Sequence, residues 1–476
     1  MRYYFLGIGG AGMSALASVL VSEGHAVSGS DESVFPPVST YLDRLGISWR
    51  DGFDPALLPA HIDEAIVGSS AKLNLADNPE LRELVRRGIA RSSFPEFLGR
   101  HTAQRRNMVV TGSFGKSTLT ALMAHLMRAA GHDPGWFVGA VPLDLPMTGY
   151  WGREAEFLIE GDEYVISTED RRPKFLLYEA SQLVVTSIVH DHLNVFPTVE
   201  SYEAAFETLI GRLPPQAPLF CARGYPALAR ITAGRNVVWY GRAPGPGYSA
   251  ENLVIGERSA FDLLTPAGEK MRLETGLIGA HNIDNIVGAA AVLLEGGLAD
   301  AEALRRGVAS FRGLERRLDR KAPAARIPLY EGFGSSYEKA RSAIEAVLAH
   351  FPRRRAVVVF EPHAFSWRRR AGLPWYDTVF AGVDEVMLLP PPGHGADAGQ
   401  ASGTEILERT TAAGVQARLI ENAEEAIAAL GRTLTGQEVI LLLSSGPLDG
   451  LPQTLPPWLE RRFPAERQAT AAASSC

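Results

Sequence analysis

The sequence predicts an α/β protein of about three domains, each built around a mostly parallel sheet. Two glycine-rich loops, at 7–12 and 112–117, each follow a short apolar strand and precede a helical pattern. After about residue 320, three apolar runs alternate with helical stretches. Strands that alternate with helices are joined by right-handed crossovers, which make neighbouring strands parallel. The 476 residues are long enough for several such domains.

Polar stretches indicate where these domains meet. The sequence "GRHTAQRRN" separates the first strand–helix block from the second, and "FRGLERRLDR" closes the second block. We therefore expect an N-terminal Rossmann-like domain at 1–103, a central domain like those of P-loop ATPases at 104–316, and a C-terminal Rossmann-like domain at 317–460. The small and polar residues at 461–476 predict a flexible tail.

The composition argues against several classes of protein. A formal net charge of -7 without a basic stripe argues against a nucleic-acid partner. No apolar run is long enough to span a membrane. The chain has only 2 cysteines, Cys221 and Cys476, which favours a reducing cytoplasm over a disulfide-stabilised secreted protein. The sequence carries no signal for the oligomeric state.

In the first domain, the loop after the strand "YYFLG" has the pattern G-x-G-x-x-G of dinucleotide-binding folds. Asp31 follows 19 residues after Gly12, at the end of the next strand, where a carboxylate can bind a ribose hydroxyl. For this loop taken alone, an NAD-dependent dehydrogenase and a tight turn without a ligand are alternatives. The candidate binding residues are Gly7, Gly9, Gly10, Ala11, Gly12 and Asp31.

In the second domain, "TGSFGKST" lies between an apolar strand and a helix with apolar residues at helical spacing. Backbone N–H groups of such a loop approach phosphates, Lys116 supplies a positive charge, and the Ser117 hydroxyl can ligate Mg²⁺. Gly112 lies only three residues before Gly115, which makes the loop shorter than the usual nucleotide loop. The candidate nucleotide-binding residues are Gly112, Ser113, Gly115, Lys116, Ser117 and Thr118.

Acidic residues and histidines follow two later strands of this domain. Glu160, Asp162 and Glu163 follow "AEFLI", where carboxylates near a phosphate loop suit Mg²⁺, and a solvated acidic turn is the alternative. The sequence "HDH" at 190–192 ends the strand "QLVVTSIV" and is compatible with a polar turn or a transition-metal pair. Lys174, taken singly, predicts an exposed lysine.

The helix that begins at "GAHNIDN" carries His281, Asn282 and Asn285 near its start. Capping of the helix by Asn282 is one explanation for these polar residues, and contact with a ligand is the other. In the third domain, the apolar runs "AVVVFEP", "DEVMLLPP" and "EVILLLSS" predict buried strands of a further doubly wound sheet.

Taken together and in order, these motifs resemble those of the Mur ligases, the ATP-dependent enzymes that build the peptide of peptidoglycan precursors. "GIGGAGMS" resembles their UDP-binding loop, and "TGSFGKST" resembles their short ATP loop, which explains its spacing. "EGDEY", "HDH", "GAHNIDN" and "FRGLERR" are similar to later motifs of the family. The resemblance extends over nearly the whole chain.

This resemblance implies a ligase reaction that uses ATP and Mg²⁺. The carboxylate of UDP-N-acetylmuramate attacks the γ-phosphate of ATP, and the amine of an acceptor then attacks the acyl phosphate. The resemblance implies catalytic roles for Lys116, Glu160 and His192, and Mg²⁺ ligation by Ser117, Glu160 and His192. It implies further contacts to ATP from His281, Asn282, Asn285 and Arg317, and to substrate from the first glycine loop, Asp31, Ser69, Ser70 and His363.

Two branches of the family act on UDP-N-acetylmuramate. One adds L-alanine, and the other, the murein peptide ligases, adds the tripeptide L-Ala-γ-D-Glu-meso-diaminopimelate in peptidoglycan recycling. The segments "SDESVFPPVSTYLDRLGI", "EGDEYVISTEDRRPKF" and "SSGPLDGLPQTL" are similar to the tripeptide branch. We therefore expect the tripeptide as the acceptor, with L-alanine as the alternative.

Several positions depart from the family pattern. "YEGFGSSYEKA" stands where a histidine-rich motif is common, and Trp367 stands where an arginine is common. A non-catalytic protein that binds the UDP-sugar and nucleotide is therefore a further hypothesis. The other departures are Phe114 for histidine, Val165 for aspartate and Val189 for glutamate.

Overall fold

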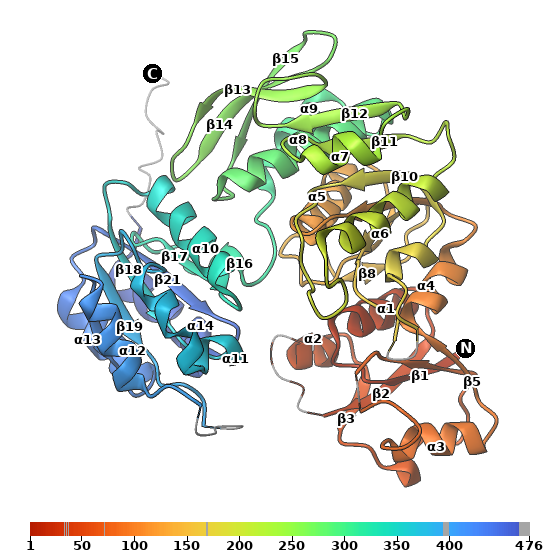
Figure 1. Cartoon of the computed structure of the whole chain (residues 1–476), viewed down its shortest axis with the longest axis horizontal. Coiled ribbons are helices and arrows are strands. Elements are labelled where there is room, and N and C mark those ends of the chain that lie inside the picture. Colours follow the sequence, from red (N-terminus) through yellow and green to blue (C-terminus); the bar gives the residue numbers. More distant parts are fainter. Residues whose placement is uncertain are drawn as a thin grey trace, which may run out of the picture. The chain divides into compact units, whose positions relative to one another are not determined.

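The computed structural model describes residues 1–465 except 33, 35, 37, 71, 168–169 and 394–398. Three sheets organise the chain, so the predicted α/β class with three sheets is confirmed (Figure 1). The second proline of the predicted Pro-Pro segment, Pro37, and residues 466–476 of the predicted tail lie outside the described residues. Among the described residues, none of the helices combines the length and the apolarity needed to cross a membrane.

The chain divides into two compact units. The first unit contains the N-terminal and central sheets, and the second contains the C-terminal sheet. The first unit consists of Met1–Val254, Ala260–Gly276 and His281–Leu314, and the second of Ile255–Ser259, Leu277–Ala280 and the chain from Glu315 onward. The predicted boundaries at about 103 and 316 stay a prediction.

The N-terminal sheet is fully parallel, with the order β3-β2-β1-β4-β5. The strand order reverses between β1 and β4, and ligands of such sheets bind beyond the carboxyl ends of the strands at that point. The strands are β1 (Arg2–Leu6), β2 (Ala26–Asp31), β3 (Ser48–Asp51), β4 (Glu64–Val67) and β5 (Ala90–Ser93). The helices are α1 (Ala11–Ser22), α2 (Val38–Arg44), η1 (Pro55–Leu57), α3 (Pro79–Arg86) and α4 (Phe94–Thr102).

Local sequence explains where these helices begin. Asn78 caps α3 by accepting a hydrogen bond from Leu81 N, and a proline occupies the first helical position. Ser93 and Glu96 form a capping box at the start of α4. The first helix begins at Ala11, and the extended residue Gly10 is its N-cap.

The central sheet has ten strands in the order β15-β14-β13-β12-β11-β10-β6-β9-β7-β8. Neighbouring strands are parallel from β7 to β13, whereas β7–β8 and β13–β14 are antiparallel. The strands are β6 (Arg106–Thr111), β7 (Gly135–Phe137), β8 (Gly149–Tyr150), β9 (Glu156–Gly161), β10 (Ala180–Val185), β11 (Leu219–Ala222), β12 (Val237–Gly241), β13 (Tyr248–Val254), β14 (Ser259–Leu264) and β15 (Lys270–Thr275). The helices are α5 (Lys116–Ala129), η2 (Lys174–Leu177), α6 (Val199–Arg212), α7 (Pro226–Ile231), α8 (Ala280–Glu295) and α9 (Ala301–Ser310).

The N-terminal and central sheets share one packed interface inside the first unit. Helix α1 packs directly on β8, so closely that a Cβ on Gly149 would lie 2.2 Å from the carbonyl oxygen of Ala15. Ser18 Oγ donates a hydrogen bond of 2.7 Å to Gly149 O. The hydrophobic core continues across this interface, from Phe5 in β1 to Phe157 in β9. The helix that follows the first glycine loop is therefore fixed against the sheet that carries the second loop.

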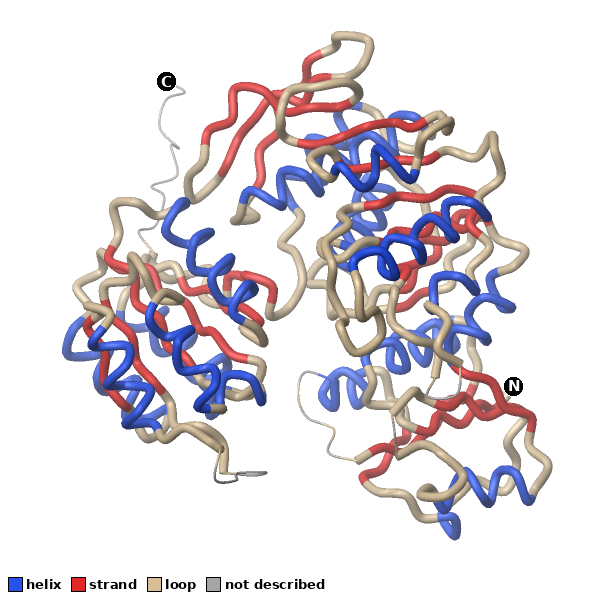
Figure 2. Tube along the Cα trace, viewed as in Figure 1, coloured by secondary structure: helices blue, strands red, loops and turns tan. Residues whose placement is uncertain are grey.

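The C-terminal sheet has the order β16-β17-β21-β18-β19-β20, and only β16 is antiparallel to its neighbour. The three predicted apolar runs form β18, β19 and β21, with Val358 and Phe360 in one core and Val357 and Val359 in another. This alternation requires helices on both faces of the sheet, as Figure 2 shows.

The second unit is completed by the following elements. The strands are β16 (Arg317–Arg320), β17 (Leu329–Phe333), β18 (Arg355–Phe360), β19 (Glu385–Leu388), β20 (Gln416–Leu419) and β21 (Glu438–Ser444). The helices are α10 (Tyr337–His350), α11 (Phe365–Arg368), η3 (Arg370–Asp377), α12 (Gly403–Ala412), α13 (Ala423–Thr433), η4 (Leu448–Gly450) and α14 (Leu451–Arg462).

Candidate active site

The central glycine loop connects the end of β6 to the start of α5. Gly112 has a φ of 134° and Gly115 a φ of 86°, both in the left-handed region that favours glycine. A Cβ on Gly112 would lie 2.3 Å from Thr186 Oγ1 and 2.7 Å from Ser187 N, so the loop has no room for a side chain there. Because β10 lies beside β6, the residues that follow β10 hold the loop in this shape.

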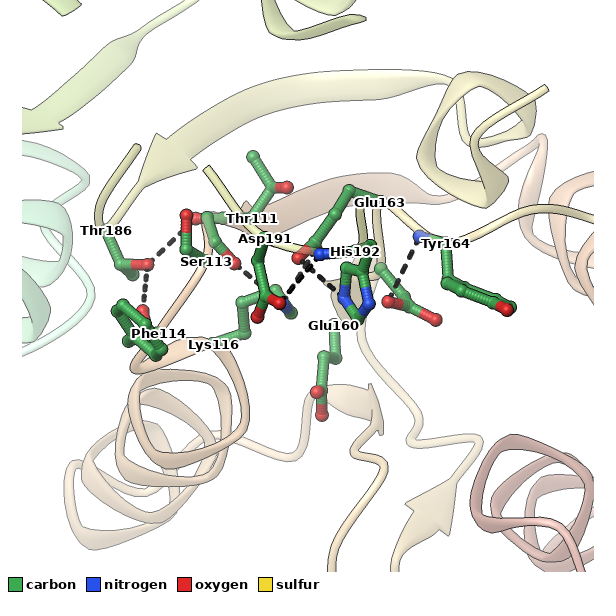
Figure 3. Close-up of polar contacts among 12 residues, drawn as sticks. Thr111, Ser113, Phe114, Lys116, Glu160, Glu163, Tyr164, Thr186, Asp191 and His192 are labelled. Atoms are coloured by element: carbon green, nitrogen blue, oxygen red, sulfur yellow. Dashed lines mark hydrogen bonds and ion pairs between the residues drawn. The ribbon is translucent and has the colours of Figure 1, made fainter. Parts of the chain in front are cut away.

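Lys116 forms a fixed positive charge on this loop. Its Nζ donates hydrogen bonds of 2.6 Å to Gly112 O and 2.7 Å to Glu163 Oε2 (Figure 3). Glu163 is fully buried, and the side chain of Lys116 is only 12% exposed. Burial is the largest single influence and works against the charge, but the carboxylates of Glu163, Asp162 and Glu160 together outweigh it and raise the pKa of Lys116. The ammonium group therefore stays charged at neutral pH.

Ser117 and Glu160 lie together, as the sequence predicts. Ser117 Oγ donates a hydrogen bond of 2.6 Å to Glu160 Oε1, and Gly139 N donates one of 2.7 Å to Glu160 Oε2. The register of the sheet explains the contact, since β6 and β9 are parallel neighbours and Thr111 pairs with Gly161. A hydroxyl and a carboxylate held at one sheet edge are the oxygen ligands that Mg²⁺ prefers.

His192 faces the buried carboxylate of Glu163 and not that of Glu160. Its Nε2 lies 3.4 Å from Glu163 Oε1, and the hydrogen bond to Glu163 raises the pKa of His192. Ligand atoms of Asp162, Glu163 and His192 all lie within 4.8 Å of one another, and within the described part of the chain no other such group of three occurs. The structure thus forms two groups, Ser117 with Glu160, and His192 with Glu163 and Asp162. The predicted ligation of Mg²⁺ by Ser117, Glu160 and His192 stays a prediction.

Lys174 is buried, so the expectation of an exposed lysine is wrong. Its Nζ donates a hydrogen bond of 2.7 Å to Asp162 Oδ2 and lies 5.2 Å from the centre of the Phe94 ring and 5.5 Å from that of Tyr164. Burial disfavours a charged Asp162, but the Lys174 and Lys116 cations outweigh it and lower the pKa of Asp162. The ion pair with the partly exposed Asp162 compensates for the burial of the Lys174 charge, whereas lysines without such a partner are usually exposed.

The first histidine of the "HDH" motif points elsewhere. His190 Nε2 lies 2.7 Å from Phe196 O, and its ring packs against Tyr202. His192 has a φ of 56°, a value that turns the chain and separates the two imidazoles. This arrangement does not favour a transition-metal site held by the two histidines.

The start of α8 reaches the phosphate loop. Asn285 Oδ1 lies 2.8 Å from the position of a Cβ on Gly115, and Asn285 Nδ2 donates to Asn282 Oδ1 at 3.1 Å. Both asparagines are buried, whereas His281 is exposed. Because Asn282 lies inside α8, the explanation that it caps the helix is wrong. Thr118, also predicted to bind nucleotide, is half-buried in the first turn of α5.

The N-terminal glycine loop is held by Asp31. Gly7 has a φ of 89°, and Gly9 N donates a hydrogen bond of 2.8 Å to Asp31 Oδ2. Burial raises the pKa of Asp31. A Cβ on Gly12 would lie 2.8 Å from the Phe94 ring, while Gly10 and Ala11 form the N-cap and first residue of α1.

A cavity of about 270 Å³ adjoins this loop. It brings together Asp31 and Ser70, two of the predicted substrate-binding residues, and Ser69 precedes Ser70 in the chain. Lys72 lies at the same cavity and forms an ion pair of 2.5 Å with Glu32. The carboxyl edge of the N-terminal sheet therefore offers a polar cavity beside a glycine loop.

Two predicted site residues belong to the second unit. Arg317 is exposed on β16, whereas its neighbour Arg316 donates a hydrogen bond of 2.6 Å to Gly446 O. His363 also packs against Gly446. A Cβ on Gly446 would lie 2.1 Å from the imidazole ring of His363. The contacts of Arg317 and His363 with ligands stay predictions.

Two of the positions that depart from the family pattern, Trp367 and Ser336, have structural roles in the second unit. Trp367 is fully buried, and its indole Nε1 donates a hydrogen bond of 2.9 Å to Gly334 O. Ser336 is the N-cap of α10, since its side chain accepts a hydrogen bond from Lys339 N. Phe114 is 45% exposed on the phosphate loop.

Family models and similar proteins all point to the same family, the Mur ligases. The family model described as "Mur ligase family, catalytic domain" matches residues 2–106, and "Mur ligase middle domain" matches residues 110–293. The UDP-N-acetylmuramate–L-alanine ligase of Roseiflexus sp. (strain RS-1) is 30% identical over 469 residues, which cover 94% of this chain and 96% of that protein.

Two further proteins are similar to this chain over most of its length. The UDP-N-acetylmuramate–L-alanyl-gamma-D-glutamyl-meso-2,6-diaminoheptandioate ligase of Escherichia coli (strain K12) is 28% identical over 409 residues, which cover 82% of this chain and 85% of that protein. The crystal structure of a UDP-N-acetylmuramate–alanine ligase from Thermotoga maritima superposes with a TM-score of 0.77 and 20% identity, and covers 97% of this chain and 98% of that one.

Proposed function

We propose that this chain, which belongs to the Mur ligase family of amide-forming ligases, joins UDP-N-acetylmuramate to L-alanine with consumption of ATP. The observation that supports the proposal best is the arrangement of charged and polar side chains at the phosphate loop. There, Lys116 is fixed by the buried Glu163, beside the oxygen atoms of Ser117 and Glu160. We expect the reaction to take place in the cytoplasm, where ATP and UDP-sugars are available.

L-alanine replaces the tripeptide that we expected from the sequence as the acceptor. Most of the similar curated proteins are named UDP-N-acetylmuramate–L-alanine ligases, although a tripeptide ligase is also similar. Three short segments favoured the tripeptide branch, whereas the L-alanine ligase of Roseiflexus sp. is 30% identical over 94% of this chain and the tripeptide ligase of Escherichia coli 28% identical over 82%. The comparisons therefore support the alternative better than the first preference.

In the proposed reaction, a carboxylate oxygen of the muramate attacks the γ-phosphorus of ATP, and the bond to the β-phosphate oxygen breaks, releasing ADP. The amine of the acceptor then attacks the carbonyl carbon of the acyl phosphate, loses a proton and displaces inorganic phosphate. Phosphoryl transfer of this kind depends on positioning and on stabilisation of the negative charge on the phosphoryl oxygens.

The residues of the central loop supply these two requirements. Backbone N–H groups at 112–117 would bind the phosphates, and Lys116, held by Gly112 O and Glu163, would direct the third N–H of its ammonium group to the transferred phosphoryl group. Asn282 and Asn285 would support the nucleotide from α8, because Asn285 contacts Gly115. An interaction that strengthens as charge develops accelerates the chemical step, which is the role we assign to Lys116.

The donor atoms at the site suit Mg²⁺. Ser117 and Glu160 would hold one ion, and His192 with Glu163 and Asp162 would hold another, although an imidazole is a less usual ligand for this metal. When bound, the metal neutralises phosphate charge.

The N-terminal cavity would bind the UDP part of the substrate. Its acidic side chain, Asp31, can bind a ribose hydroxyl, and the backbone amides at the start of α1 can bind the diphosphate. Ser70 and Lys72 line the same cavity and would contact the substrate from the other side.

The test is phosphate release from ATP and Mg²⁺ with UDP-N-acetylmuramate and one acceptor at a time. The acceptors are L-alanine, L-serine, glycine and the tripeptide L-Ala-γ-D-Glu-meso-diaminopimelate, and a reaction without acceptor is the control. We expect release with L-alanine. Release with the tripeptide alone would favour the recycling branch, and no release despite binding of the UDP-sugar would favour a non-catalytic protein.

A further inference from the structure

A tyrosine hydroxyl joins the phosphate loop to the carboxylate that holds Lys116. Tyr202 Oη lies 2.8 Å from Ser113 Oγ and 3.4 Å from Glu163 Oε1. We propose that Tyr202 is a positioning residue, which acts through Glu163 and Ser113 to align Lys116 with the loop. The inference rests on the proposed ATP-dependent function, and it assigns no contact between Tyr202 and a substrate.

Packing fixes the Tyr202 ring. The residue is fully buried and lies in the first turn of α6, where its backbone N donates to Thr198 O at 3.2 Å. Its ring packs edge-on against Phe196, with centroids 5.2 Å apart, and against Phe206 at 5.1 Å. A ring that is held on several sides places its hydroxyl at one point, so the hydroxyl can serve as a fixed reference for both of its partners.

Two hydroxyl protons cannot make all three contacts at once, namely Ser113 with Val189 O, Ser113 with Tyr202, and Tyr202 with Glu163. Val189 N donates to Ser113 Oγ, and Val189 O lies 2.7 Å from the same oxygen. If Ser113 donates to Val189 O, Tyr202 is free to donate to Ser113. If Ser113 instead donates to Tyr202, the tyrosine proton turns to Glu163. The orientation of a hydroxyl on the phosphate loop is thereby coupled to the hydrogen bonding of Glu163.

Tyr202 Oη is a hydrogen-bond donor to the buried carboxylate of Glu163. Glu163 has two oxygens with different neighbours, since Oε2 accepts from Lys116 Nζ while Oε1 faces Tyr202 and His192. Without the tyrosine hydroxyl, Oε1 loses one of the two contacts that the described residues give it, and the carboxylate can rotate away from the alignment that holds Lys116.

The test compares Tyr202→Phe with Tyr240→Phe, a matched control. Tyr240 is equally buried in the central domain, but its hydroxyl lies 3.3 Å from a backbone carbonyl, that of Val185. We expect kcat of Tyr202→Phe to fall about tenfold, as expected for one hydrogen bond to a charged group. KM for UDP-N-acetylmuramate and for the acceptor should stay within about twofold, and Tyr240→Phe should keep the parental kcat.

A double-mutant cycle with Ser113→Ala tests the linkage itself. If the two hydroxyls act as one unit, the double variant should lose about as much kcat as the more affected single variant. Losses that multiply would overturn the inference, as would parental kcat in Tyr202→Phe. A fall in unfolding temperature with equal changes in all KM values would also overturn it, because that pattern is a general loss of structure.

A measurement of nucleotide binding tests the positioning role of Tyr202 independently of the proposed function. We expect the affinity for the fluorescent analogue TNP-ATP to fall about threefold in Tyr202→Phe and to remain unchanged in Tyr240→Phe. This measurement requires no turnover. Absence of phosphate release by the parental protein would overturn the proposed function alone, whereas unchanged binding of TNP-ATP in Tyr202→Phe would overturn the positioning role.

Discussion

The two glycine loops of the first unit have the same backbone plan but different electrostatics. Each follows a buried parallel strand, contains a glycine with a left-handed φ and leads into a helix. In the first loop, Gly9 N donates to Asp31, and the first turn of α1 carries no acidic side chain. In the second loop, Lys116 is the first residue of α5 and is paired with the buried Glu163.

The carboxylates at the two sheet edges also differ in their electrostatics, because their pKa values shift in opposite directions. Burial raises the pKa of Asp31, at the end of β2. Burial also acts on Asp162, just after β9, but there Lys174 and Lys116 lower the pKa. A diphosphate that is only bound needs backbone amides and hydroxyl acceptors, whereas a phosphate that reacts needs charges to stabilise the transition state. The comparison therefore supports the proposal that the first loop binds substrate and the second takes part in the chemistry.

The largest expected effect is on Lys116. Lys116→Ala should lower kcat by at least about 10²-fold with little change in KM for UDP-N-acetylmuramate, because the lysine acts mainly as charge develops. The matched control is Lys72→Ala, which removes the cation at the N-terminal cavity and should change mainly that KM. Steady-state kinetics of phosphate release distinguish the two, and near-normal turnover of Lys116→Ala would break the comparison.

A smaller difference between the two loops is expected in the stability cost of replacing a glycine, because the space around Gly112 is more restricted than that around Gly7. Gly112→Ala should lower the free energy of unfolding by about 2 kcal/mol or more, since its Cβ would meet the backbone of Ser187 at a left-handed φ. Gly7→Ala should cost about 1 kcal/mol, because the atom it meets, at 2.6 Å, is the flexible end of Leu73. Urea denaturation gives both values, and equal costs would contradict this difference between the loops.

Asp31 should affect binding without affecting the chemical step. Asp31→Ala removes the acceptor for Gly9 N and the carboxylate at the cavity, so the Kd for UDP-N-acetylmuramate should rise about tenfold. Isothermal titration calorimetry measures this change, and kcat at saturating substrate should remain near the parental value. A large loss of kcat would show that the first loop takes part in the chemistry.

The smallest effects are in the pH dependence of stability. The raised pKa of Asp31 means that its native form binds a proton more tightly than the unfolded chain, so its contribution to stability falls as pH rises above about 3.8. The lowered pKa of Asp162 has the opposite sign, since its contribution is present above 3.8 and is lost as pH falls through the folded pKa.

Thermal unfolding of the nucleotide-free and metal-free protein tests these signs. Relative to the parental protein, Asp31→Asn should gain stability between pH 4 and pH 7. Asp162→Asn should be destabilised at pH 7, and its deficit should shrink below pH 3.8. Two variants with the same pH trend would mean that the two sheet edges do not differ electrostatically.

Most of the fold could be predicted because buried parallel strands are continuous apolar runs. The runs that became β9, β10, β18, β19 and β21 were all identified from the sequence. The edge strands β3, β5 and β20 were missed, since "SWRD", "ARSS" and "QARL" lack that signal. Edge strands are half-exposed and owe their conformation to pairing with a neighbour.

The site was predicted less completely than the fold. Lys116, Ser117 and Glu160 follow from motif spacing, but the burial of Lys174 does not, because a lysine is exposed unless a partner compensates its charge. Glu163 stood among the sequence candidates without a distinct role, and Tyr202 carried no signal beyond the apolar face of a helix. Both depend on contacts between distant segments.

By itself the sequence determined the two loops, their chemical types and the family to which the chain belongs. Only the tertiary structure decided which charges are paired. Lys116 and Glu163 are 47 residues apart, and they meet because β6 and β9 are parallel neighbours whose carboxyl ends share one edge. Spacing along a chain fixes the chemistry within a loop, but the electrostatic partner of a buried charge is set by the strand order and register that bring separate segments together.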